Sequence, residues 1–228
     1  MPAPGVSSLG SRIREERLRR GVSLRGLARD VGVSASMISQ IETGKTRPSV
    51  STLYAITSAL GVSIEEVFAP AVEPGGAVAA VPAIVEPVVA AGEPVANSSG
   101  PALDAVGRLG PVVRPADRQS LTLDTGVIWE RLGELVGQAV DFLLVTYPPG
   151  GSSSSTGGLM RHSGAEYGFL IRGELVLNLG FGEFRLHAGD AFSFESTTPH
   201  SYRNEGSEPA VSIFFVIERD VLLGEGLT

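Results

Sequence analysis

Apolar positions in the first third of the chain recur at helical intervals and are interrupted by glycines. Leu9, Ile13 and Leu18 are spaced for one face of a helix, and Gly21 stops the pattern. A short last run begins at Ser63. Three runs lie between these, each with a serine that can cap a helix and a glycine that can end it, at residues 23–32, 34–44 and 49 or 51 to 61. The pattern predicts five short helices packed as a compact bundle.

The period of the pattern changes in the second half of the chain. Apolar or alternating runs there are broken by glycine and proline–glycine turns, which indicates short β-strands. The runs are "WERLGEL", "AVDFLLVTYPPG", "EYGFLIRGELVLNLG", "EFRLHAGDAFSFES" and "AVSIFFVIERD". Several short strands at this spacing are typical of a closed barrel or jelly roll. The fold class expected is therefore an α-helical domain followed by an all-β domain.

Residues 70–102 fit neither pattern. The segment holds six prolines and no lysine or arginine, and alanine and valine dominate the rest. Proline recurs too often for a helix, so we interpret the segment as a mostly extended or disordered linker. The flanking domains, residues 7–69 and 103–222, are then expected to move fairly independently.

Composition restricts the chemistry that the chain can carry. The 228 residues include no cysteine, so any metal site must use histidine, aspartate or glutamate. No stretch approaches about 18 uninterrupted apolar residues, and the N-terminus lacks a charged-then-apolar signal pattern. We therefore expect a soluble, cytoplasmic protein without a membrane partner.

The net charge of −7 conceals an asymmetry. Residues 7–68 hold nine basic and six acidic side chains, a balance of +3, whereas the rest of the chain holds nine basic and nineteen acidic ones, a balance of −10. A basic patch on an acidic chain favours a local surface for a polyanion. An ordinary solvated helix face would give the same charge count, so charge alone leaves both interpretations open.

The segment "SLRGLARDVGVSASMISQIETGKTRPS" has the order helix, glycine-containing turn, helix. Ala28 is small where two helices would cross, and Gly32 can adopt the left-handed conformation of the turn. The outward positions of the second helix, Ala35, Ser36, Ser39 and Gln40, are small or polar, and such side chains can meet base edges in a major groove.

This segment resembles the Cro/C1-type (XRE) family of DNA-binding domains over about residues 9–68. The resemblance implies that Ala35, Ser36, Ser39 and Gln40 read bases and that Ser34, Lys45 and Arg47 contact phosphates of double-stranded operator DNA. Phage repressors of the family often have a phosphate-binding glutamine where this chain has Leu24, and we expect the neighbouring Arg25 to take that role. The alternative is a helical bundle that does not contact DNA.

Residues 162–200 begin and end with histidine and contain Glu166, which together are the side chains that a mononuclear metal site needs. The region 108–220 resembles the cupin fold, whose two motifs are matched by Glu166, Gly173, the turn "HAGD", His200 and Asn204. Two positions depart from the family. Met160 stands where its first histidine would be, and His187 replaces the proline of the turn.

His162, Glu166 and His200 could hold a divalent metal such as zinc, iron, manganese or nickel. The alternative is an apolar pocket in which both histidines form hydrogen bonds and an organic ligand binds without a metal. In either case we expect the effector pocket to be lined by Met160, His162, Glu166, His200 and Tyr202.

A Cro/C1-type domain followed by a cupin resembles bacterial transcriptional regulators in which the cupin senses a small-molecule effector. This interpretation predicts a homodimer, paired through residues 108–220, and no enzymatic activity. The alternative is a mononuclear non-haem iron oxidase or epoxidase of the hydroxypropylphosphonate epoxidase type, which has the same two parts. The small polar second motif helix and the long linker favour the regulator.

Overall fold

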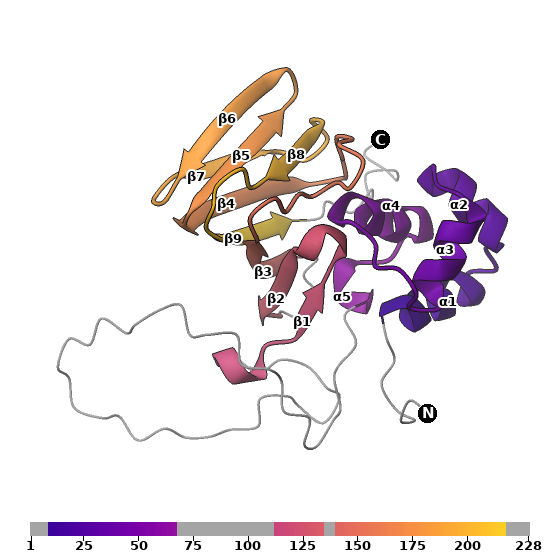
Figure 1. The fold of residues 1–228 in the computed structure, drawn as a ribbon. Coiled ribbons are helices and arrows are strands. Elements are labelled where there is room, and N and C mark those ends of the chain that lie inside the picture. Colours follow the sequence, from indigo (N-terminus) through magenta and orange to yellow (C-terminus); the bar gives the residue numbers. More distant parts are fainter. Residues whose placement is uncertain (1–8, 68–111, 135–139, 218–228) are drawn as a thin grey trace, which may run out of the picture.

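The computed structural model describes residues 9–67, 112–134 and 140–217 (Figure 1). The predicted linker, residues 70–102, lies outside the described residues, and so do the outer ends of both predicted domains. The domain boundaries therefore stay predictions. In the described part of the chain, no helix is long and apolar enough to cross a membrane.

The helical bundle is present, but with four full helices rather than five. The fifth predicted helix is a single turn of four residues. The serines at 23, 34 and 49 each accept a hydrogen bond from a backbone N–H in the first turn, so Ser49 and not Ser51 is the cap of the fourth helix. The elements are α1 Leu9–Arg19, α2 Leu24–Val31, α3 Ala35–Glu42, α4 Val50–Leu60 and α5 Ile64–Val67.

Leu18, which the spacing placed on the same helical face as Ile13, points to solvent instead, and so does Met37 on α3. Leu18 is 59% exposed and Met37 is 39% exposed. The buried face of α1 uses Gly10 and Arg17 beside Ile13. A Cβ on Gly10 would lie 2.0 Å from the carbonyl oxygen of Ile41, so α1 approaches α3 too closely for any larger residue.

The second half folds into two sheets rather than a closed barrel. The strands are β1 Ser120–Thr122, β2 Ile128–Gly133, β3 Val140–Tyr147, β4 Ala165–Arg172, β5 Glu174–Leu179, β6 Gly182–His187, β7 Ala191–Glu195, β8 His200–Arg203 and β9 Ala210–Ile217. One sheet has the order β1-β2-β3-β9-β4-β7 and the other β6-β5-β8, and strand pairing does not close them into a ring within the described residues. The prediction of a closed barrel was therefore wrong. The chain changes sheets after β4, after β6, after β7 and after β8.

The inner faces of the two sheets form the core of the second domain. Side chains alternate along β3, where Leu143, Val145 and Tyr147 are buried and their neighbours are partly exposed. Opposite positions on β9 contribute Phe214 and Val216. The same side chains of β3 and β9 line a small cavity in this core.

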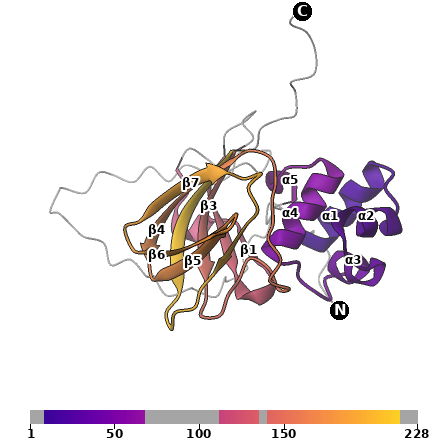
Figure 2. The same ribbon diagram turned by 90° about the horizontal axis from the view of Figure 1, so that it is seen from above.

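The helical bundle packs directly against the sheets, contrary to the expectation that the two parts move independently. In both ribbon views α4 lies between the strands and helices α2 and α3 (Figures 1 and 2). The backbone N–H of Ser51 donates to the carbonyl of Ser153, and that of Asp124 donates to the carbonyl of Pro48, each at 2.9 Å. The buried apolar side chains of both parts form one continuous cluster. The contact between the bundle and the sheets is made by the apolar surface of α4. The composition of the linker therefore could not indicate it.

Candidate metal centre and DNA-binding surface

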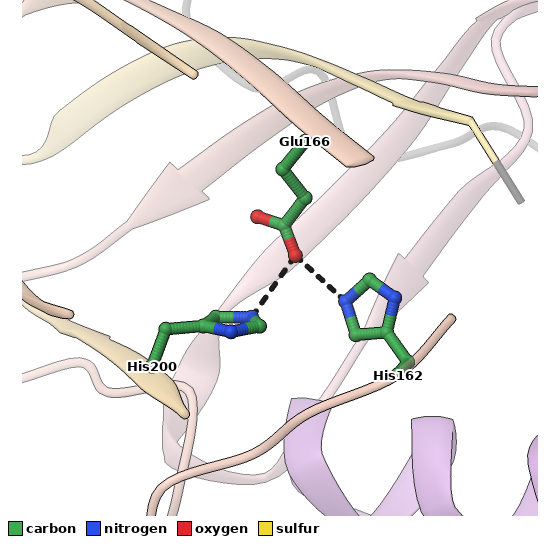
Figure 3. A group of neighbouring side chains, drawn as sticks. All are labelled: His162, Glu166 and His200. Atoms are coloured by element: carbon green, nitrogen blue, oxygen red, sulfur yellow. Dashed lines mark hydrogen bonds and ion pairs between the residues drawn. The ribbon is translucent and has the colours of Figure 1, made fainter. Parts of the chain in front are cut away.

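Two segments of the chain, residues 162–166 and the start of β8, bring His162, Glu166 and His200 together inside the second domain (Figure 3). His162 lies in the loop before β4, Glu166 is on β4, and His200 opens β8. The Oε1 atom of Glu166 is 2.7 Å from Nε2 of His162 and 3.0 Å from Nε2 of His200. All three residues are buried. The separation of 38 residues along the chain therefore disappears in the fold.

Backbone carbonyls fix the orientation of both imidazole rings. The Nδ1 atom of His162 is 3.1 Å from the carbonyl oxygen of Ser163, and that of His200 is 2.8 Å from the carbonyl oxygen of Thr198. A carbonyl only accepts, so each Nδ1 carries the proton and donates. In a neutral ring the lone pair is then on Nε2, which faces Glu166. Carbonyl partners at the far nitrogen are the arrangement that orients histidine ligands in metal sites.

The carboxylate of Glu166 is held in its charged form. Burial raises the pKa of its carboxyl, but the nearby rings of His162 and His200, where a proton lies on Nε2, outweigh burial and lower the pKa to about 2. Its second oxygen accepts a hydrogen bond of 2.7 Å from the hydroxyl of Tyr202. Burial, followed by the charge of Glu166, raises the pKa of the Tyr202 phenol well above its ordinary value, so the phenol stays neutral and donates.

The donor set fits a divalent cation. Two ligand atoms at about 2.1 Å from one cation and at right angles to each other lie about 3 Å apart. The two nitrogen–oxygen distances of 2.7 and 3.0 Å are close to this spacing. The Nε2 atom of His200 is buried and makes no hydrogen bond of acceptable geometry. A lone pair on a buried nitrogen that faces a carboxylate is unfavourable unless a proton or a cation lies between them.

A small apolar cavity reaches this group of ligands. Its volume is about 20 Å³, which is room for about one water molecule. Of the predicted pocket residues, Met160, Glu166 and Tyr202 line it, whereas His162 and His200 lie beside it without lining it. The complete lining is Val50, Tyr54, Trp129, Leu143, Val145, Tyr147, Met160, Glu166, Tyr202, Phe214 and Val216.

Sequence reasoning missed Val50 and Tyr54, which belong to α4 of the helical domain. The Tyr54 ring stacks on the imidazole of His162, with ring centroids 4.1 Å apart and planes 2° apart. The Tyr54 ring also contacts Trp129, with the two rings at 61° and 5.7 Å between centroids. No signal in the sequence indicated this contact, because a buried tyrosine on an amphipathic helix is indistinguishable from the core of its own domain.

The predicted DNA-binding residues lie on α3 or in the segments that flank it, except Arg25, which lies on α2. Ser34 caps α3 by accepting from the backbone N–H of Met37 at 3.1 Å, and Ala35 is half-buried. The backbone N–H of Lys45 donates to the carbonyl of Gln40 at 2.8 Å, which holds the following turn against the end of the helix. The exposed members of the set are Arg25, Ser34, Ser36, Ser39, Gln40, Lys45 and Arg47.

One of the nine basic residues counted in this region does not contribute to a surface patch. Arg17 is 7% exposed, and its guanidinium donates to both oxygens of Glu42, at 2.5 and 2.9 Å. It also donates to the carbonyl of Val22. This buried pair joins α1 to the end of α3, so its charges are compensated inside the bundle.

Comparison with known proteins defines the class to which the chain belongs. A helix-turn-helix family model (HTH_3) matches residues 13–67, and a cupin domain family model (Cupin_2) matches residues 143–217. The chain is thus a helix-turn-helix transcriptional regulator of the HTH_3 (XRE) type with a C-terminal cupin domain.

The relatives agree with this assignment over most of the chain. The HTH-type transcriptional regulator PuuR, from Escherichia coli (strain K12) and from Shigella flexneri, is 28% identical over 195 residues, which are 86% of either chain. An HTH_3 family transcriptional regulator from Vibrio cholerae shares the fold, with a TM-score of 0.59 at 20% identity over 93% of this chain and 96% of that one. Hydroxypropylphosphonic acid epoxidase from S. wedmorenis aligns over 92% of this chain and 96% of its own at 19% identity, but its TM-score of 0.41 is too low to support any inference.

Proposed function

We propose that this regulator binds a specific operator through α3 and that its cupin domain binds a small-molecule effector at the His162–Glu166–His200 group. The observation that carries the proposal is the presence of both sites on one chain: an exposed polar helix flanked by cations and a buried ligand set next to a cavity. An enzyme would have no use for the first of these sites.

The contacts proposed for DNA follow from the side chains that α3 exposes. The amide of Gln40 can form two hydrogen bonds with adenine, and Ser36 and Ser39 can donate to or accept from base edges. Arg25, Ser34, Lys45 and Arg47 would contact phosphates, which position the helix without reading sequence. The cap hydrogen bond of Ser34 uses only its oxygen as an acceptor, so its hydroxyl proton remains able to reach a phosphate.

We also propose that His162, Glu166 and His200 hold a divalent cation, with zinc, iron, manganese or nickel as candidates. Two imidazole nitrogens and one carboxylate oxygen leave further coordination positions open. A cation there would supply a Lewis-acidic anchor for an oxygen or nitrogen of the effector. The protein's own residues would orient the rings, exclude bulk water through the apolar lining, and hold the second oxygen of Glu166 through the hydroxyl of Tyr202.

The same donor set occurs in non-haem iron oxygenases, and this keeps an oxidase or epoxidase as the second candidate function. The exposed polar helix α3 and the cations beside it argue against it, because an enzyme has no use for such a surface. Oxygen consumption by the iron-loaded chain, measured with and without small hydroxylated acids, separates the two candidates.

A dimer is proposed on the outer surface of the six-stranded sheet. Six apolar side chains there form a continuous patch, which we call the outer stripe. Each phenylalanine or tyrosine in it faces an apolar partner on the next strand, and three members are 39–49% exposed. A second copy of the chain would cover this patch and supply the second recognition helix that a pseudo-palindromic operator requires. The stripe consists of Phe142, Leu144, Tyr167, Phe169, Ile213 and Phe215.

The proposed function is tested by selecting binding sites from a random duplex library with the full-length protein. We expect enrichment of one pseudo-palindromic site and tight binding to it in gel-shift titrations, weakened by substitution of Gln40 and unaffected by Ser58→Ala on the exposed face of α4. A library that shows no enrichment, with equal affinity for all duplexes, refutes the proposal.

A further inference from the structure

The cavity beside Glu166 has walls from both domains. Strands supply most of the lining, but Val50 and Tyr54 come from α4 of the helix-turn-helix domain. Tyr54 is 5% exposed and its ring lies flat on His162. The DNA-binding domain therefore touches a residue of the candidate metal centre directly, and it closes the cavity on that side.

The present cavity is too small for an organic effector. Its volume of about 20 Å³ compares with roughly 300 Å³ or more for typical small-molecule sites. Binding of anything larger than a water or an ion requires one wall to move. The wall that moves most easily is the one whose displacement breaks the fewest contacts.

The strand walls are held far more firmly than the α4 wall. β3 and β9 pair over eight successive positions, and β9 pairs with β4 on its other side. Among the described residues, backbone hydrogen bonds at the boundary with α4 are formed by Ser51, which follows the lining residue Val50, and by Asp124, which donates to Pro48 just before the helix. The side chains of Val50 and Tyr54 also pack across this boundary. A movement of α4 therefore disturbs less pairing than a movement of any central strand.

The stacked pair also responds to the charge on His162. An imidazole that binds a cation through Nε2 carries partial positive charge, and an electron-rich phenol ring attracts such a charge across its face. Occupancy of the metal centre thus strengthens the contact between Tyr54 and His162. A larger ligand that enters the cavity competes with the same ring for space.

We propose that the effector site is shared between the two domains, with α4 as its movable wall and Tyr54 as the residue that positions His162 and communicates occupancy of the site to the helix-turn-helix domain. This inference rests on the proposed function, since it gives the regulator a physical link between its two sites. Tyr54 is a positioning residue here, because its ring acts on the cation and on DNA through its neighbours.

Trp129 provides a reporter for the first experiment. It is the only tryptophan of the chain and contacts Tyr54. Zn²⁺ is titrated into the metal-free full-length protein while Trp129 fluorescence is recorded, for wild type, Tyr54→Phe, Tyr54→Leu and the control Ser58→Ala. We expect Tyr54→Leu to weaken Zn²⁺ binding by about tenfold or more, as loss of a residue that orients a ligand does. Tyr54→Phe retains the flat ring and is expected to stay within about twofold of wild type.

The second experiment measures communication. Operator affinity is compared between chelator-treated and Zn²⁺-loaded protein for the same variants. We expect the two affinities to differ by about fivefold or more in wild type and in Tyr54→Phe, and by less than about twofold in Tyr54→Leu, the size of coupling that is usual between sites. Circular dichroism at the outset establishes that each variant is folded.

Should Tyr54→Leu fail to fold, hydrogen exchange on the wild type replaces it. The inference requires slower exchange in residues 50–57 on addition of Zn²⁺, and unchanged exchange there overturns it. Unchanged Zn²⁺ affinity in a folded Tyr54→Leu variant also overturns it, and so does an operator affinity of wild type that is indifferent to Zn²⁺. Absence of any operator binding instead refutes the proposed function, and leaves the result of the Zn²⁺ titration standing.

Discussion

Replacing Glu166 by glutamine separates the role of a metal ligand from that of a structural hydrogen-bond acceptor. Glutamine has the same shape, but its amide nitrogen donates two hydrogen bonds. Those donors face the Nε2 atoms of His162 and His200, which carry lone pairs in the neutral rings, while the amide oxygen still accepts from Tyr202. Every polar atom of the group thus retains a partner without a cation.

This arrangement predicts how Glu166→Gln changes the free energy of unfolding with and without Zn²⁺. In the presence of chelator, the free energy of unfolding of Glu166→Gln should stay within about 1 kcal/mol of wild type, because neutral hydrogen bonds replace an uncompensated lone-pair contact. With Zn²⁺ at about 100 times the dissociation constant, wild type should gain about 2.7 kcal/mol and the variant should gain almost nothing. For a protein of this size, that gain corresponds to a rise in melting temperature of about 5–11 °C.

Thermal and urea unfolding with and without Zn²⁺ are the assays, and Glu174→Gln, at an exposed position of β5, is the control that should keep the full Zn²⁺ response. Two results refute the reasoning. A Zn²⁺-dependent rise in the melting temperature of Glu166→Gln would exclude the carboxylate as a required ligand. A loss of more than about 3 kcal/mol without any cation would mean that the carboxylate compensates buried imidazolium charge, and not a metal.

Three further predictions concern the rest of the molecule. Gln40→Ala should reduce the binding free energy for the selected operator by about 1–3 kcal/mol and relax base preference at one position. Arg47→Ala should weaken binding to all duplexes alike and reduce the slope of log affinity against log salt concentration by about one. Gel-shift titrations measure both effects. A Gln40→Ala protein with unaltered specificity contradicts the assignment of α3. Phe215→Glu places a charge in the outer stripe and should convert the dimer into a monomer in sedimentation experiments. The control Phe181→Glu, on the fully exposed turn after β5, should remain a dimer. A dimer in both variants contradicts the proposed interface. Gly10→Ala should lower the free energy of unfolding by about 1–3 kcal/mol, because the added Cβ clashes with the carbonyl of Ile41. The clash outweighs the better helix propensity of alanine. Equal urea midpoints for the variant and wild type would contradict this prediction.

The sequence predicted those features that depend on local chemistry. Serine caps and glycine stops located the helices, and Gly32 adopts the expected left-handed conformation at φ 77°. Periodicity was less reliable at single positions. It assigned Leu18 to the core, but the buried residue of that turn is Arg17, because Glu42 on α3 offers it a paired partner. A buried ion pair cannot be recognised from one of its members.

Features that depend on which surfaces meet could not be predicted in the same way. The runs of alternating residues located seven of the nine strands in the described residues. β1 has only three residues and lies outside these runs, and β8 lies in a segment with no apolar alternation and begins at His200 itself. The division into two sheets follows from which strands pair, and periodicity does not contain that information. His162, Glu166 and His200 were nevertheless expected to converge, because the cupin resemblance supplied the pairing that the pattern lacked.

The helix α4 explains why a contact invisible to the sequence can matter for regulation. Leu53, Ile56 and Leu60 are buried in the helix-turn-helix domain, whereas Val50 and Tyr54 line the cavity of the cupin. One helix of eleven residues thus carries two apolar faces. The residues of each face recur at the three- and four-residue spacing of a helical turn. A hydrogen-bonded helix moves as a unit, so displacement of Tyr54 from His162 must also displace the side chains on which α2 packs. Coupling between the two domains therefore needs no ordered linker, and it depends on how tightly one ring remains stacked on another.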